Sequence, residues 1–280
     1  MKNNKLEILN KKVLKDFGNE WKEFDQSILS LKELKISFNQ YFYIFPKKKF
    51  NKKSVGFDLG CGSGRWAKFV APKVKKLNCI DPSKLAIKVA KKNLSEFKNI
   101  NYYNKRISRK LLINNSQDFG YCLGVLHHTS ETKKGIKFCH RILKKNSPFL
   151  IYLYYNFDNR NFIYKFIWKI SNILRLFISK LPFSIKKKIT DFLALIIYLP
   201  LAKLSYILNL LGLNTFNLPL SYYKNKSFYT MRNDSLDRFG TRLEKRFSKN
   251  EIYYLLKSCG FKDIKFSKKM PFWVAICKKS

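Results

Sequence analysis

Residues 55–65 combine small side chains and an acid in a spacing that suits close approach to a ligand. The segment reads Val-Gly-Phe-Asp-Leu-Gly-Cys-Gly-Ser-Gly-Arg, with glycines in G-x-G-x-G spacing from Gly60 to Gly64. Glycines directly after a strand let the backbone turn sharply and approach a bound molecule. Asp58 precedes the turn, and Asp81 ends the next apolar run, where a carboxylate can accept hydrogen bonds from ribose hydroxyls. The alternatives are a dinucleotide site, whose spacing is G-x-G-x-x-G, and a bare tight turn.

The segments around this turn alternate between strand-like and helix-like patterns. This rhythm predicts a parallel sheet covered by helices on both faces. Expected helices cover 64–74, the segment starting at Pro82, 131–144 and the segment from a capping box at 248–251 to a cap at Gly260. The apolar face of the second of these should consist of Leu85, Val89, Ala90 and Leu94. Expected strands cover 55–59, 77–81, 100–103, 119–125, 149–154, 261–266 and 272–277.

The same pass divides the chain into three parts. Residues 1–54 are predicted to form an N-terminal helical cap, with capping-box spacing at 30–33. Residues 55–155 and 245–280 form the main domain, and 156–244 form a helical insertion with a substrate loop, too long to be a bare connection.

Residues 55–81 resemble the first motifs of class I S-adenosylmethionine-dependent methyltransferases, especially small-molecule enzymes related to those of quinone biosynthesis. The similarity continues through 116–128 and 140–154 and through the last two strands, and a Phe-Gly-Asn-Glu-Trp segment at 17–21 often precedes such domains. The resemblance implies an α/β, Rossmann-like, doubly wound fold. Its seven-stranded sheet would be mostly parallel with an antiparallel final strand, and the helical insertion would precede the last helix.

The resemblance also implies S-adenosyl-L-methionine as cofactor and maps its contacts onto this chain. One position departs from the family, in which an acid after the third strand often contacts the adenine amino group. Here the matching residue is Arg106, so adenine is expected to be held by backbone groups near it. The cofactor-binding residues implied in this way are Asp58, Gly60, Cys61, Gly62, Gly64, Asp81, Pro82, Arg106, Ile107, Leu123 and Gly124.

His127 and His128 are the candidate catalytic residues. They follow the fourth expected strand, at the carboxyl edge where ligands bind in such sheets. Histidine suits general-base work near neutral pH, and the alternative is that one of the pair only packs the loop. The turn lacks the Asn/Asp-Pro-Pro-Tyr/Phe motif of enzymes that methylate planar amines.

We therefore expect methyl transfer to oxygen or carbon of a small or lipid-like acceptor. The alternatives are an RNA methyltransferase and, in another class, a non-catalytic cofactor-binding scaffold or a membrane-surface protein.

The insertion carries two apolar stretches, 159–181 and 192–213. On the first, polar residues from Lys165 to Lys180 occupy a narrow face, whereas the second is interrupted by Pro200. A lid over an apolar substrate is the favoured interpretation, and a membrane-surface element or a plain packing cap are the alternatives. Candidate substrate contacts, which could equally be surface or packing residues, are Trp21, Tyr222, Tyr229, Arg238 and Arg242.

The net charge of +39 comes from 57 Lys and Arg against 18 Asp and Glu, spread along the whole chain. Lys, Asn, Ile, Phe and Tyr are all abundant and all have A/T-rich codons, so a biased genome would give this composition without a nucleic-acid partner. The six cysteines form no C-x-x-C pair, which predicts buried free thiols and no metal site. The N-terminus lacks the apolar core of a signal peptide, so we expect a cytoplasmic protein, either soluble or peripheral to a membrane.

Overall fold

The computed structural model describes residues 2–280, with side chains from residue 7 onward, and it divides into two compact units. The first unit comprises the chain up to Asn156 together with Leu243–Ser280. The second unit is Phe157–Arg242. All six cysteines are buried and free, as predicted.

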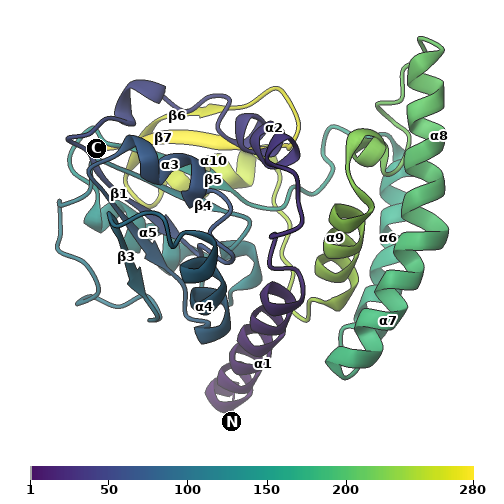
Figure 1. The fold of residues 1–280 in the computed structure, drawn as a ribbon, viewed down its shortest axis with the longest axis horizontal. Helices are drawn as coiled ribbons and strands as arrows, with labels where there is room; N and C mark the ends of the chain where they lie inside the picture. The colour runs from purple at the N-terminus through teal and green to yellow at the C-terminus, as the bar shows by residue number, and fades with distance from the viewer. Residues whose placement is uncertain (1) are drawn as a thin grey trace. The chain divides into compact units, whose positions relative to one another are not determined.

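The first unit is built on a seven-stranded sheet with the order β3-β2-β1-β4-β5-β7-β6 (Figure 1). Strands β1 to β5 pair in parallel, whereas β7 runs antiparallel to both of its neighbours. This arrangement confirms the predicted Rossmann-like fold class. The strands are β1 Val55–Leu59, β2 Lys76–Ile80, β3 Ile100–Tyr103, β4 Phe119–Leu123, β5 Pro148–Tyr152, β6 Phe261–Phe266 and β7 Ala275–Lys279.

Helices cover both faces of this sheet because side chains alternate between the faces along each strand. One buried cluster joins the sheet to α2, α3 and α4, and the other joins it to α5 and α10. The helical segments of this unit are α1 Lys2–Glu23, α2 Leu31–Tyr41, η1 Lys47–Lys49, α3 Ala67–Val70, η2 Ala71–Lys73, α4 Lys84–Asn93, η3 Leu126–His128, α5 Thr132–Ile142 and α10 Lys249–Lys257.

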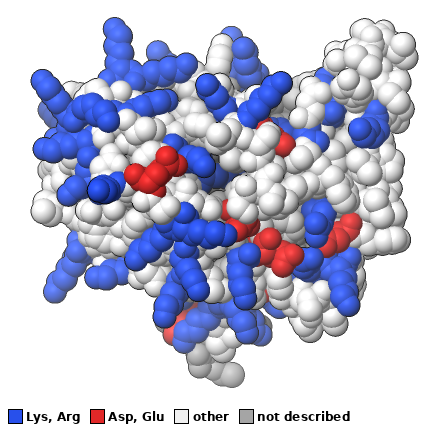
Figure 2. Space-filling model, viewed as in Figure 1, with Lys and Arg blue, Asp and Glu red and all other residues white. Residues whose placement is uncertain are grey.

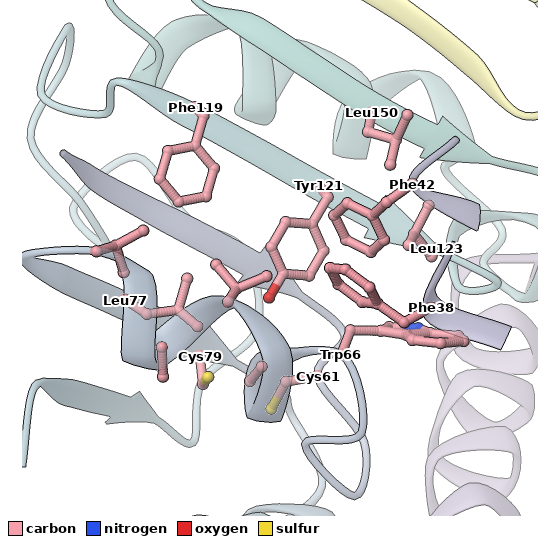
Figure 3. Close-up of a cluster of buried hydrophobic side chains, with 14 of the residues drawn as sticks. Phe38, Phe42, Cys61, Trp66, Leu77, Cys79, Phe119, Tyr121, Leu123 and Leu150 are labelled. Carbon is pink, nitrogen blue, oxygen red and sulfur yellow. The ribbon is translucent and has the colours of Figure 1, made fainter. Parts of the chain in front are cut away.

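Aromatic side chains of α2 and of its C-cap residue pack on the sheet beside the glycine turn at residues 60–64, called the cofactor loop below. Phe42 stacks on Phe38 at 4.2 Å and meets the ring of Tyr121 edge-on at 5.2 Å (Figure 3). Tyr121 belongs to β4 and is fully buried. The segment after residue 30, which sequence analysis placed in a cap, therefore supplies core side chains to the sheet.

Two expected helices differ from those observed. The helix predicted over 64–74 is shorter, because Pro72 has no N–H to continue it and the chain tightens into η2. In α4 the buried residues are Ala86, Ile87 and Ala90 rather than Leu85 and Val89. The small residues face the core, and Leu85 instead lies beside Gly18 of α1.

The second unit consists of helices α6 Phe162–Ile178, α7 Phe183–Leu193, η4 Ala194–Tyr198, α8 Leu199–Leu210, η5 Ser221–Asn225 and α9 Phe228–Gly240. The stretch Phe183–Leu210 is one continuous helix of 28 residues, which by length and composition alone could cross a membrane. Sequence analysis took Pro200 as an interruption, but it sits in the first turn of α8 after the wider π-type turn η4. The helix tolerates proline there.

Gly120 of β4 gives the sheet its sharpest packing constraint and generates the first prediction. A Cβ on Gly120 would lie 2.1 Å from the ring of Phe57, its neighbour in β1. Both residues are buried, so the ring has little room to move. We expect Gly120→Ala to lower the free energy of unfolding by about 1–3 kcal/mol in urea titrations. The exposed strand variant Lys262→Ala should change it by less than about 0.5 kcal/mol. Equal effects of the two variants would contradict this packing account.

Candidate active site

The glycine turn is held to the end of β2 by backbone hydrogen bonds. The N–H groups of Gly60 and Cys61 both donate to the carbonyl of Ile80, at 2.7 and 3.2 Å. One Asp81 carboxylate oxygen accepts from the N–H of Gly62 at 3.0 Å, and the other accepts from that of Ser83 at 2.8 Å. Asp81 therefore connects the turn to the start of α4, and the two acids predicted from the sequence lie at one edge of the sheet.

Burial raises the pKa of both acids. The pKa of Asp58 rises to about 8, an effect of burial that the neighbouring Tyr121 hydroxyl partly offsets. The pKa of Asp81 rises to about 6, because burial outweighs the hydrogen bonds from Ser83 and Gly62. One carboxyl oxygen of Asp58 and the hydroxyl of Ser63 are buried with no hydrogen-bond partner among the described residues. Buried polar atoms of this kind normally have a partner, so they point to a bound polar ligand.

Two glycines shape the surface of the turn. Gly62 has a φ of +53°, and a Cβ there would come within 2.7 Å of the Trp21 indole. Gly124, which follows β4, has a φ of +78°, and a Cβ there would meet nothing within 4 Å. The sheet edge is therefore tightly packed on the Trp21 side and open beside Gly124.

Helix α1 lies along this edge through Phe17, Gly18 and Trp21. A Cβ on Gly18 would lie 2.7 Å from the Ser83 hydroxyl, so only glycine allows α1 to approach α4 this closely. Arg65 lies 5.5 Å from the Trp21 ring in a cation–π geometry. Trp21, which the sequence suggested as a substrate contact, is thus placed against the cofactor loop.

The remaining implied cofactor residues surround the loop. The Asn104 side chain donates to the backbone carbonyl of Asp81 at 3.1 Å, which fixes the segment after β3. In that segment Arg106 is exposed and Ile107 half-buried, as the backbone-contact expectation allows. Leu123 is buried beside Gly124, and Pro82 is exposed. The adjacent Cys79 thiol and burial both raise the pKa of Cys61, so its thiol is neutral and lines the turn as an apolar group.

His127 is fully buried and stacks on the ring of Tyr154 at 3.8 Å. The backbone N–H of Tyr154 donates to its Nδ1 at 3.4 Å, which assigns the ring proton to Nε2. Burial holds the pKa of His127 well below its usual value, with His128 and Arg246 contributing in the same direction. A neutral ring whose lone pair is already engaged packs the turn and makes a poor proton acceptor.

His128 has the opposite tautomer. Its Nδ1 lies 2.8 Å from the carbonyl of Leu243, and because a carbonyl only accepts, Nδ1 carries the proton. The lone pair of the neutral ring is then on Nε2. The rings of Phe17 and Tyr154 lie 4.8 and 5.3 Å from that of His128. Of the two predicted histidines, His128 has the geometry of a general base in aromatic surroundings.

Sequence analysis missed the residues that hold this histidine pair in place. Arg246 lies 5.1 Å from the Tyr154 ring, donates to the carbonyl of Tyr155 and pairs with Glu244 at 2.8 Å. The backbone N–H of Lys245 donates to the carbonyl of His127 at 3.0 Å. The only sequence signal was that the chain must return here from the insertion to start α10.

The other suggested substrate contacts lie in the second unit, where each has neighbours of its own. Arg238 donates to the Ser171 hydroxyl at 2.9 Å, and Arg242 donates to the carbonyl of Lys180 at 3.3 Å. Tyr222 packs against Tyr223. Tyr229 is half-buried in α9. Among the described residues, no group of three His, Cys, Asp or Glu is placed to hold a metal ion.

Comparison with known proteins gives this geometry a family. Residues 57–151 match the model of a methyltransferase domain. The chain therefore contains a class I S-adenosylmethionine-dependent methyltransferase domain. A search of curated protein sequences finds no match.

Solved structures show the same fold for this methyltransferase. A candidate methyltransferase from Bacillus halodurans matches with a TM-score of 0.51 at 12% identity, over 82% of this chain and 70% of that one. A Haloferax volcanii complex of the Trm112 methyltransferase activator with a candidate methyltransferase also matches with a TM-score of 0.51. There the identity is 9%, over 94% of this chain and 96% of that one.

The residues at the sheet edge fit S-adenosyl-L-methionine. Asp81 is placed to accept hydrogen bonds from ribose hydroxyls, and the buried polar atoms of Asp58 and Ser63 lie where polar groups of a ligand can reach the turn. The open space beside Gly124 leaves room for the reacting part of the cofactor.

Asp81 generates the second prediction. In isothermal titration, Asp81→Asn should weaken the binding of S-adenosylhomocysteine by roughly 1–3 kcal/mol through loss of an acceptor oxygen. Because the pKa of Asp81 is about 6, the wild-type carboxyl gains a proton as the pH falls through 6. Wild-type affinity should therefore fall between about pH 7.5 and 5, and the variant should lose most of this dependence.

The matched control is Asp263→Asn, which alters an acid on β6 whose side chain is half exposed. It should leave affinity and its pH dependence unchanged. An Asp81→Asn protein that binds as tightly as wild type at pH 7.5 would remove Asp81 from the cofactor site.

Proposed function

We propose that this methyltransferase acts on a small or lipid-like acceptor and transfers the methyl group to oxygen or carbon. The observation that supports this most directly is the tautomer of His128. When bound, S-adenosylmethionine supplies an activated methyl group on a sulfonium, so the acceptor must be positioned in line and must lose a proton. The Nε2 lone pair of His128 can accept that proton from a hydroxyl or from an acidic carbon.

The surroundings of His128 favour an apolar acceptor. Its ring is bordered by His127, Phe17 and Tyr154. The ring of Tyr154 in turn lies 5.9 Å from that of Tyr152. Aromatic rings bind apolar and planar molecules by burying their surface, and a histidine among them supplies the proton acceptor that an alcohol, phenol or carbon acid needs.

The hydrogen bond between Nδ1 and the Leu243 carbonyl keeps His128 ready for this role. It fixes the ring orientation and leaves the basic nitrogen on the other side of the ring. Leu243 is the first residue after the second unit, so the return of the chain to the first unit positions the proposed base.

The strong positive charge does not favour an RNA acceptor. Lys and Arg side chains are spread over the visible face and are not gathered into one stripe (Figure 2). Recognition of nucleic acid usually requires basic residues clustered on one face or along a groove. The charge distribution therefore supports the compositional explanation.

The two histidines provide the test of this proposal and the third prediction. The protein is incubated with S-adenosylmethionine labelled in its methyl group and an organic extract of cells, and label transferred to extractable products is measured. His128→Asn should lower the turnover rate by about 10²- to 10⁴-fold and leave the binding of S-adenosylhomocysteine intact.

His127→Asn is the matched neighbour variant. Because His127 is fully buried against Tyr154, we expect it to lower the melting temperature, with turnover per folded molecule reduced by less than about tenfold. If His128→Asn retains full turnover, or if label enters RNA and not the organic phase, the proposal is wrong.

A further inference from the structure

The second unit exposes many apolar side chains and buries several polar ones beside a small apolar cluster that includes Ile178, Met231 and Phe239. Thirty large apolar side chains are exposed in the described part of the chain, and 21 of them lie in this unit, which holds less than a third of the residues. Exposed apolar side chains are ordinary when scattered, but a contiguous set marks an interaction surface. The concentration of exposed apolar side chains in the second unit therefore calls for a physical explanation.

Helix α6 shows the inversion most clearly. Its exposed side chains cover about half of the helix circumference and, apart from Lys169, are all apolar. The opposite half carries Ser171, Asn172 and Arg175, and Arg175 is buried with a hydrogen bond to the carbonyl of Thr241 at 3.0 Å. Part of the narrow polar face that the sequence predicted thus faces the interior of the unit, whereas its Lys169 and Lys180 are exposed. The exposed residues are Phe162, Ile163, Phe166, Ile167, Ile170, Ile173, Leu174, Leu176 and Phe177.

The continuous helix Phe183–Leu210 repeats this pattern. Its buried stripe is made of small or polar residues in steps of three or four, namely Lys186, Thr190, Ala194, Tyr198, Ala202 and Ser205. Its outer surface is mostly Phe, Leu and Ile, and in Figure 2 the surface over α8, at the upper right, is almost entirely white. The exposed residues here include Phe192, Leu195, Ile196, Leu204, Ile207 and Leu210.

Hydrogen bonds and ion pairs connect the helices of this unit beside its apolar cluster. Lys186, only 1% exposed, donates to the carbonyl of Gly240 at the end of α9, at 3.0 Å. Arg232 of α9 pairs with Asp191 of α7 through two hydrogen bonds of 2.8 and 2.9 Å. The Ser235 hydroxyl donates to the carbonyl of Thr190 at 2.8 Å. A polar interior of this kind holds helices together where the surroundings are as apolar as the helix exteriors.

We propose that the second unit docks on an anionic phospholipid bilayer, with the apolar faces of α6 and of Phe183–Leu210 lying in the boundary between headgroups and acyl chains. The charge supports this occupant, since the unit carries fourteen Lys and Arg against four Asp. Lys169, Lys180, Lys188 and Lys203 are exposed near the apolar faces, where their long stems can reach phosphate groups.

The arrangement of charge favours lying on the bilayer over crossing it. Lys203 is exposed within α8, and Asp191 of α7 is tied to Arg232 of α9. A helix that crossed the bilayer would carry these groups toward its centre, which is costly. The proposal rests on the second unit alone.

Vesicle flotation tests this inference and gives the fourth prediction. Vesicles contain phosphatidylcholine with about one third phosphatidylglycerol, and flotation is measured at about 0.15 M and about 0.5 M salt. The test variant replaces Phe166, Ile170 and Phe177 of α6 with serine. These side chains are 50–68% exposed, so folding should be preserved, as S-adenosylhomocysteine binding and circular dichroism can verify.

The matched control replaces Ile28, Ile113 and Tyr254 of the first unit with serine, removing three side chains that are 65–80% exposed with the charge unchanged. Wild type and control should float at both salt concentrations, because apolar insertion survives screening of charge. The α6 variant should partition into vesicles at least about tenfold less well.

Several outcomes would overturn the proposal. One is a wild-type protein that floats at neither salt concentration. Another is flotation that is lost at the higher salt concentration and is equal for the α6 variant and the control. That result would mean that the protein adsorbs to the vesicles by charge alone. A third is an α6 variant whose flotation is unchanged but whose oligomers, measured by light scattering without lipid, have a lower mass. That result would mean that a second copy of the chain covers the apolar face of α6. Each of these results is independent of S-adenosylhomocysteine binding, so none of them tests the assignment of the cofactor site.

Discussion

The site depends on the hydrogen bonds that the carboxylate of Asp81 accepts. Its two oxygens accept from Gly62 and Ser83, so one side chain fixes both the glycine turn and the start of α4. Burial of this carboxylate raises its pKa to about 6. Its hydrogen bonds lie in a region of low dielectric, where they are electrostatically stronger than in water. The sheet makes this arrangement possible, because its parallel strands bring the ends of β1, β2 and β4 to one edge.

The second unit distributes its side chains differently from the first and has only one small apolar cluster. In the first unit apolar side chains fill two clusters on either side of a sheet, as water requires. In the second, Lys186, Thr190 and Ser205 are buried while the apolar residues of α6 and α8 face outward. One chain thus combines a sheet with apolar cores on both faces and a helical unit with a largely apolar exterior, and the chain re-enters the first unit at Leu243.

The fold was largely predictable because hydrophobic periodicity and turn residues act locally. β1, β3 and β6 begin and end where the apolar runs do, and the capping box at Ser248 opens α10. The cofactor loop was predictable for the same reason, since its glycines and acids lie close together in sequence. The choice of His128 as the proposed base was not, because the tautomer of His128 depends on Leu243, more than a hundred residues away. Nor could periodicity show which face of α6 is exposed, since an apolar stripe looks the same whether protein or lipid covers it.

The most direct test of the central claim is the choice of ligand at the glycine turn. Calorimetric titration of the wild-type protein with S-adenosylhomocysteine and, separately, with NAD compares the two ribose-bearing ligands that such a turn could hold. The account predicts binding of S-adenosylhomocysteine with one site per chain and a Kd of about 1–100 μM, and no heat of binding for NAD. A protein that binds NAD and fails to bind S-adenosylhomocysteine would contradict it.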